Sequence, residues 1–103
     1  MNLKLEPEKH ETYQESLIRE ISQTVMVKLV EAGMTGEKLE EATADISFSI
    51  ASILDDTTAI EADGIAVKPY LTFRDGDDDI IHCGENAYTY EFVRGILKEM
   101  FDR

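Results

Sequence analysis

Three aspartates at alternate positions, Asp75, Asp77 and Asp79, have the spacing with which a helix–loop–helix calcium site begins. Such a loop also needs glycine at its sixth position and a bidentate glutamate at its twelfth. This chain has Ile80 and Asn86 at those two places. The pattern therefore indicates a solvated acidic turn, and we expect no calcium site.

His82 and Cys83 are adjacent and Glu85 follows two residues later, so three ligand types for zinc are close together in sequence. A structural zinc site takes four ligands, and the second histidine, His10, is remote in sequence. Consecutive residues of a strand also face opposite sides of a sheet, which separates His82 from Cys83. We expect no metal and no cofactor.

Cys83 is the one candidate nucleophile. It precedes a predicted helix start, where the helix dipole favours a thiolate. Nucleophilic catalysis also needs a positioned base and an oxyanion site, and His82 is expected to point away. We interpret Cys83 as a core thiol and assign no catalytic residue. A small cysteine-dependent enzyme that uses Cys83 is the alternative hypothesis.

The chain has 103 residues, of which 43% are hydrophobic, and this predicts a single domain over residues 1–103 with its own core. One cysteine cannot form an internal disulfide, as is ordinary in a reducing compartment. The amino-terminal residues lack the apolar core of a secretory signal, and no run approaches the roughly 20 apolar residues of a membrane span. We expect a soluble cytoplasmic protein that does not contact membranes.

Charge gives the clearest indication of function. The 22 acidic and 10 basic residues give a net charge of −12, which repels nucleic-acid phosphates and anionic membranes. Residues 33–64 are the most acidic part, with one basic and eight acidic residues. We therefore expect no direct binding of nucleic acid. The charge either keeps the protein dispersed or forms a surface for a basic partner.

Apolar residues at three- and four-residue spacing predict a first helix from Pro7 or Thr12 to Gly33. Gly33 can take the left-handed conformation of a Schellman ending, with Met34 next to Leu29. Further apolar residues widen the arc and suggest burial on two sides or contact with another subunit. The predicted core stripe is Leu17, Ile18, Ile21, Val25 and Leu29, and the wider arc is Met26, Val27 and Val30.

A second helix is expected after a cap at Thr35, and the short connection makes it antiparallel to the first. Residues 46–50 alternate as a strand would, but the helix formers that precede them favour helix. A third helix is expected after a cap at Asn86, with Gly95 at a close packing contact. The second helix has a predicted core stripe of Leu39, Ala42, Ile46, Ile50 and Ile53.

The segment from Ile65 to Cys83 predicts a β-hairpin. Residues 65–73 alternate as a half-buried strand does, an Asp-Gly turn with an acidic tip follows, and residues 80–83 form the second strand. Pro69 indicates a sheet edge or a bulge. Residues 57–64 are expected to be a loop or a short added strand. Leu3 and Leu5 alternate with polar residues and suggest a short extended arm or a frayed start.

The elements together predict an α+β fold in the order α-α-β-β-α, with the helices packed on one face of a small antiparallel sheet. Apolar surface that a monomer leaves uncovered predicts a homodimer, joined either by the hairpins edge to edge or by the first helix, which is the first choice because Pro69 interrupts the edge. The leading functional hypothesis is a non-enzymatic binding or regulatory protein for a basic partner, including an inhibitor whose carboxylates imitate phosphates. A structural subunit of a larger assembly is a further alternative. The proposed partner-binding residues are Asp55, Asp56, Asp63, Asp75, Asp77, Asp78 and Asp79.

Overall fold

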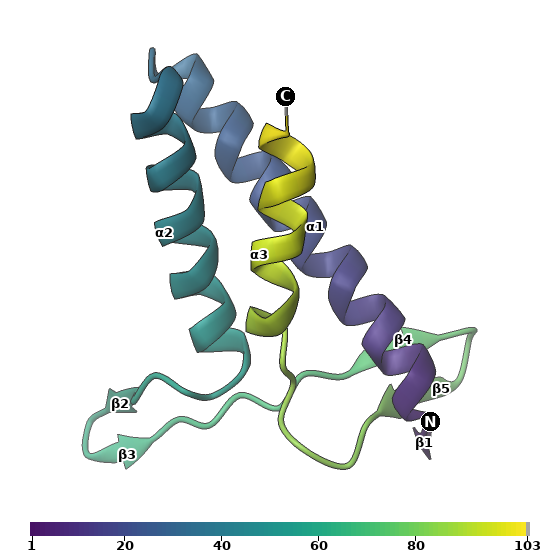
Figure 1. The fold of residues 1–103 in the computed structure, drawn as a ribbon. Coiled ribbons are helices and arrows are strands. Elements are labelled where there is room, and N and C mark those ends of the chain that lie inside the picture. Colours follow the sequence, from purple (N-terminus) through teal and green to yellow (C-terminus); the bar gives the residue numbers. More distant parts are fainter. Residues whose placement is uncertain (103) are drawn as a thin grey trace.

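The computed structural model describes residues 1–102, which form three helices and two small sheets (Figure 1). The α+β class and the order of helix, helix, strands and helix are as predicted, and residues 46–50 are helical. The elements are β1 (Asn2–Leu5), α1 (Pro7–Glu31), α2 (Gly36–Leu54), β2 (Glu61–Ala62), β3 (Ile65–Ala66), β4 (Phe73–Asp75), β5 (Asp79–His82) and α3 (Tyr90–Phe101).

The helices form the body of the molecule. α1 and α2 are joined by a short connection, and α3 packs on both of them (Figure 1). The three-stranded sheet lies at the amino-terminal end of α1, while the β2–β3 hairpin projects on the other side (Figure 1). The buried apolar cluster between the helices consists of Ile18, Ala51, Val93, Ile96 and Leu97.

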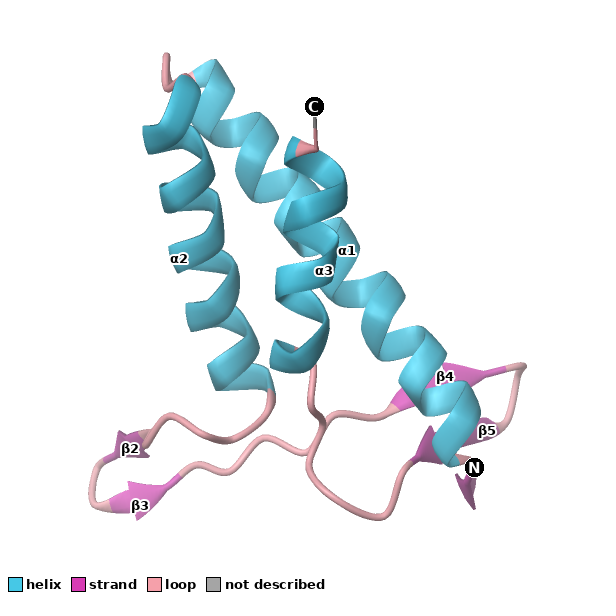
Figure 2. Ribbon diagram, in the orientation of Figure 1, coloured by secondary structure: helices cyan, strands magenta, loops and turns pink. Residues whose placement is uncertain are grey.

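The predicted hairpin is correct at its turn and second strand but wrong in its first strand. β4 pairs antiparallel with β5, whereas residues 65–66 belong to a separate hairpin with β2. The segment between them is a loop (Figure 2). Pro69 has no N–H for a ladder, and the Leu71 carbonyl accepts a hydrogen bond from His10 Nε2 at 2.9 Å. Because of these two features, residues 67–72 do not pair as part of a strand.

The three-stranded sheet is mixed, so the expectation of a purely antiparallel sheet is wrong. The suggested amino-terminal arm is β1, which pairs parallel with β5 and leaves the order β1-β5-β4. The Asn2 N–H donates to the Asp78 carbonyl at 2.7 Å, and the Glu6 N–H donates to the His82 carbonyl at 3.0 Å. A two-stranded hairpin is marginal alone, and β1 supplies the third strand.

The end of α1 follows from local sequence. Gly33 has a φ of 94°, the left-handed region that glycine tolerates best. The Met34 N–H donates to the Leu29 carbonyl at 3.0 Å, and the Gly33 N–H donates to the Val30 carbonyl at 2.9 Å. This is the Schellman ending that the sequence predicts.

The predicted core stripe of α2 is wrong. Ile46 and Ile53 are 38% and 45% exposed, and the fully buried positions of this helix are Thr43, Ser47 and Ala51. The buried side chains are small, which lets α1 approach α2 closely. Ile46 and Ile53 therefore lie outside the core, and the other three residues of the predicted stripe are half-buried.

α1 shows a similar departure. Of its predicted stripe only Ile18 is fully buried, and the other four side chains are half-buried. The remaining buried positions of α1 are His10, Gln14 and Ser22, which share the four-residue spacing of Ile18. The inner face of α1 is therefore largely polar.

The expectation of close packing at Gly95 is also wrong. A Cβ at Gly95 would meet no atom within 4 Å, and the residue is exposed in the middle of α3. We predict that Gly95→Ala stabilises the protein by up to about 1 kcal/mol, because alanine is the better helix former. Gly33→Ala is the matched control and should destabilise by about 1 kcal/mol, because Gly33 has a positive φ. Urea unfolding of both variants checks this, and a destabilising Gly95→Ala would contradict it.

Candidate functional site

The predicted acidic residues do not form one surface. Asp75, Asp77, Asp78 and Asp79 gather at the β4–β5 turn. Asp63 lies in the β2–β3 turn with a φ of 52°, on the opposite side of the molecule (Figure 1). Asp56 follows the end of α2, also with a positive φ of 59°.

Two of the four aspartates at the β4–β5 turn already have cationic partners. Lys9 Nζ lies 3.0 Å from Asp75 Oδ2, and Lys4 Nζ lies 3.1 Å from Asp79 Oδ2. Asp77 and Asp78 are exposed, and within residues 1–102 neither has an ion pair. The free negative charge of this turn therefore comes from Asp77 and Asp78.

The sequence predicts that Asp55 lies on an exposed acidic surface. This prediction is wrong, because Asp55 is only 3% exposed. Asp55 Oδ1 accepts hydrogen bonds from the Thr89 N–H at 2.9 Å and the Thr89 hydroxyl at 2.7 Å, and Oδ2 accepts from the Tyr90 N–H at 3.0 Å. The carboxylate caps the amino-terminal end of α3, where the helix dipole favours negative charge. The expected cap, Asn86, does not have this role, since α3 begins at Tyr90.

A second buried side chain completes this cap. The Tyr88 N–H donates to Gln14 Oε1 at 2.7 Å, and Gln14 Nε2 donates to His10 Nδ1 at 2.9 Å. Because a backbone N–H can only donate, the amide oxygen of Gln14 must face Tyr88. The amide nitrogen of Gln14 then faces His10 Nδ1, which must accept. His10 then carries its proton on Nε2 and donates it to the Leu71 carbonyl. The relay fixes two loops to α1.

Cys83 does not have the neighbours that a nucleophile requires. Its thiol donates to the Glu85 carbonyl at 3.1 Å. His82 Nδ1 lies 2.9 Å from the Tyr70 hydroxyl and accepts from the Gly84 N–H at 3.2 Å, so the adjacent imidazole serves other groups. In the described part of the chain no group of three or more His, Cys, Asp or Glu side chains is placed to hold a metal ion.

The three-stranded sheet has one covered and one bare face. Ile81 lies between Lys4 and Phe73 in the ladder and is fully buried. The Phe73 ring contacts the rings of His10 and Tyr13 of α1, at 5.1 and 5.5 Å between centroids. Paired residues of neighbouring strands share a face, so this row faces α1.

The next row faces away from α1. It contains Leu3, Ile80 and Arg74, and Leu5 follows beside His82. Leu3 and Leu5 are 65% and 61% exposed. Tyr70 packs on His82 at one end of this face, and the remainder, which we call the bare face, has an apolar centre next to the β4–β5 turn. We call Leu3, Leu5, Ile80, Asp77 and Asp78 the sheet-face site.

β1 is also an edge strand. The N–H groups of Asn2 and Glu6 point toward β5, and residues of a parallel strand alternate between its two edges. The backbone groups of Leu3 and Leu5 therefore face the open edge, where an extended peptide can pair with them. In the sequence analysis Leu3 and Leu5 have no part in binding. Their alternation with polar residues is the pattern that could have indicated a strand with one exposed apolar face.

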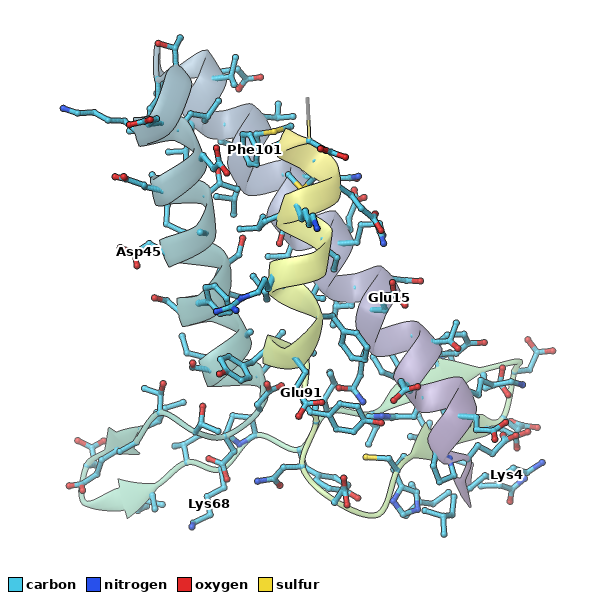
Figure 3. All side chains as sticks on the ribbon, viewed as in Figure 1. Lys4, Glu15, Asp45, Lys68, Glu91 and Phe101 are labelled. Atoms are coloured by element: carbon cyan, nitrogen blue, oxygen red, sulfur yellow. The ribbon has the colours of Figure 1, made fainter. Side chains whose placement is uncertain are left out.

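Asp55 provides a stability test of the cap. We predict that Asp55→Ala lowers the free energy of unfolding by about 2–4 kcal/mol, because it leaves buried donors of Thr89 and Tyr90 unpaired. Asp55→Asn keeps one acceptor oxygen and should lose less. Asp45→Ala, within α2, is the control, since the Asp45 side chain points outward (Figure 3). Equal losses for Asp55→Ala and Asp45→Ala in denaturant unfolding would contradict the cap.

The Lys4–Asp79 pair gives a pH prediction. The hydrogen bond from Lys4 holds the pKa of Asp79 below its ordinary value of 3.8; loss of water opposes this shift and Asn2 assists it. The stabilisation from the pair is therefore present above pH 3.8 and is lost as the pH falls through the lower, folded pKa. We predict that Lys4→Met raises the pKa of Asp79 in an NMR titration, while Lys68→Met, in an exposed loop (Figure 3), does not. An unchanged pKa of Asp79 in the Lys4→Met variant would refute the Lys4–Asp79 pair.

None of the helices within residues 1–102 is long and apolar enough to cross a membrane. No protein-family model, no curated protein and no solved structure matches this chain. The candidate function therefore depends on the geometry of the sheet-face site.

Proposed function

We propose that the protein is a non-catalytic binding or regulatory module that engages a basic partner protein through the sheet-face site. The observation that carries this proposal is the bare face of the three-stranded sheet, where Leu3 and Leu5 are more than 60% exposed beside an acidic turn. Interfaces commonly combine an apolar centre with a polar rim, and this site has both.

Charge supports a basic partner. The net charge of −12 attracts cationic proteins over long distances, and Asp77 and Asp78 are exposed in the β4–β5 turn, where the Asp78 carbonyl accepts from the N–H of Asn2, the residue before Leu3. Arg74 lies on the same face, so the acidic excess comes from the turn. Such complementarity accelerates association and makes it depend on salt.

The hypothesis of an inhibitor whose carboxylates imitate nucleic-acid phosphates has less support. Such an inhibitor needs a series of free carboxylates along one surface. In the structure Asp55 is buried, Asp75 and Asp79 are paired with lysines, and Asp63 is on the opposite side. We therefore propose recognition of a basic and partly apolar protein surface.

We also propose that the protein works in the cytoplasm. Its single thiol, Cys83, is half-buried and has no cysteine to pair with, which suits a reducing compartment.

The test is recovery of bound proteins from native cells with the wild type, a Leu3→Ser/Leu5→Ser variant and a Val27→Ser/Val30→Ser control. The control removes apolar side chains of similar exposure, 47% and 51%, from the far end of α1. We expect a basic protein to be retained at low salt by the wild type and the control, to be released by high salt, and to be absent with the sheet variant. Equal retention by the sheet variant would refute the site.

The acidic rim is tested separately. Asp77→Asn/Asp78→Asn should slow association with the recovered partner at low salt and have little effect at high salt, because steering by charge is screened. Stopped-flow or surface-binding rates measure this. Identical association rates at low salt would remove the acidic turn from the proposal.

A further inference from the structure

β1 is an edge strand whose outward hydrogen-bonding groups have no partner in the chain. It is the outermost strand in the order β1-β5-β4, and all four of its residues are exposed. The N–H groups of Asn2 and Glu6 donate to β5, so the N–H and C=O groups of Leu3 and Leu5 point the other way. Within residues 1–102 no strand pairs with them. The group that satisfies alternate donors and acceptors of this kind is an extended peptide backbone.

β1 also lacks the features that usually protect an edge. Native sheets shield their edges with charged side chains, proline or bulges. The charged residue of β1, Lys4, is held by Asp79 at 3.1 Å, and Pro7 comes only after the strand has ended. The other edge strand, β4, is less accessible, because two of its three residues are half-buried and Asp75 is paired with Lys9.

Acidic side chains flank both ends of the β1 edge. At its start, the β4–β5 turn is joined to β1 by the hydrogen bond from the Asn2 N–H to the Asp78 carbonyl. At its end, Glu6 follows the strand directly and lines a shallow surface pocket together with Glu8. The carboxylates at the two ends that have no ion pair within residues 1–102 are those of Asp77, Asp78, Glu6 and Glu8.

These charges decide which extended segment fits. If β1 paired antiparallel with β1 of a second copy, the turn acids of each copy would face Glu6 and Glu8 of the other. If it paired parallel, identical acids would face each other. Both arrangements bring like charges together, which is destabilising. A basic segment is instead attracted at both ends. It would lie two strand spacings, or about 10 Å, from β5, and the Debye length is also about 10 Å at 0.1 M salt.

A strand added to β1 has a defined pattern of side chains. Paired residues share a face, so alternate side chains of the added strand lie on the bare face next to Leu3 and Leu5. Because Leu3 and Leu5 are 65% and 61% exposed, apolar side chains at those positions cover apolar surface. The residue between them lies on the side of α1, next to Lys4. The complementary segment is therefore basic, apolar, variable, apolar and basic.

We propose that the basic partner is bound by strand addition, in which an extended segment of the partner pairs with the open edge of β1. Its apolar side chains lie beside Leu3 and Leu5, and its basic side chains lie at the two acidic ends. This inference rests on the proposed function and adds to it the mode of binding and the sequence pattern of the bound segment.

A blocked peptide, Lys-Lys-Val-Thr-Val-Lys-Lys, is the probe, titrated at low salt into isotope-labelled protein. We expect the NMR signals of the Leu3 and Leu5 amides to shift and their hydrogen exchange to slow. The Lys4 amide, which already faces β5, should change less. The same peptide with glutamate in place of each lysine should not bind. No binding of the lysine peptide, or equal binding of the glutamate peptide, would overturn the inference.

Backbone methylation distinguishes strand addition from contact through side chains alone. One version of the lysine peptide is N-methylated at its first valine and another at its threonine. Alternate N–H groups of a strand face opposite sides, so one version should bind like the parent and the other more than about fivefold more weakly. Equal affinities would overturn strand addition. Loss of both in Leu3→Ser/Leu5→Ser would then still support the sheet-face site, so the two proposals can fail separately.

Glu6→Gln/Glu8→Gln tests the charges at the end of the edge. This variant should bind the lysine peptide about fivefold more weakly at low salt, because the attraction at one end is lost. Glu37→Gln/Glu41→Gln is the matched control, since it removes the same charge from exposed residues at the start of α2, at the opposite end of α1 (Figure 1). Equal weakening by both variants would show an effect of net charge alone and overturn this placement of the peptide.

Discussion

The rest of the structure depends on how the start of α3 is held. The first N–H groups of a helix have no partner within the helix, and at α3 they lie in the interior. Gln14 of α1 accepts from the Tyr88 N–H, and Asp55, just after α2, accepts from the N–H groups of Thr89 and Tyr90. An acid at the end of α2 is unfavourable for the dipole of α2 but favourable for that of α3. Three elements are therefore joined at one point by buried polar groups.

This arrangement places polar and small residues inside and apolar residues outside. His10, Gln14, Thr43 and Ser47 are fully buried, whereas Leu3, Leu5, Ile46 and Ile53 are exposed by a third or more. The side chains of His10, Gln14 and Thr43 have hydrogen-bond partners, which ties the fold to one geometry, whereas the buried hydroxyls of Ser22 and Ser47 have none among the described residues. Leu3 and Leu5 lie together on the bare sheet face, and most of the other exposed apolar side chains are spread over the three helices, the β2–β3 hairpin and the loops. The bare sheet face is suited to protein contact, and that is why binding is the function that we propose.

Features that depend on neighbouring residues could be predicted from the sequence. The Schellman ending at Gly33, the turn at Gly76 and the helical state of residues 46–50 follow from local chemistry. Features that depend on distant partners could not. Asp55 caps a helix that starts 35 residues later, and β1 pairs with a strand more than 70 residues away. The core stripe predicted for α2 is wrong, because periodicity locates the apolar side chains of a helix but not the side of the helix that its neighbours cover.

Amide hydrogen exchange at Tyr88, Thr89 and Tyr90 tests the central claim most directly. N–H groups in the first turn of a helix usually exchange quickly because they lack partners. If Gln14 and Asp55 hold them, these three amides should be protected to a similar degree as those of Val93 and Leu97 in the core of α3. Exchange as fast as that of Gly76 in the exposed β4–β5 turn would contradict the account.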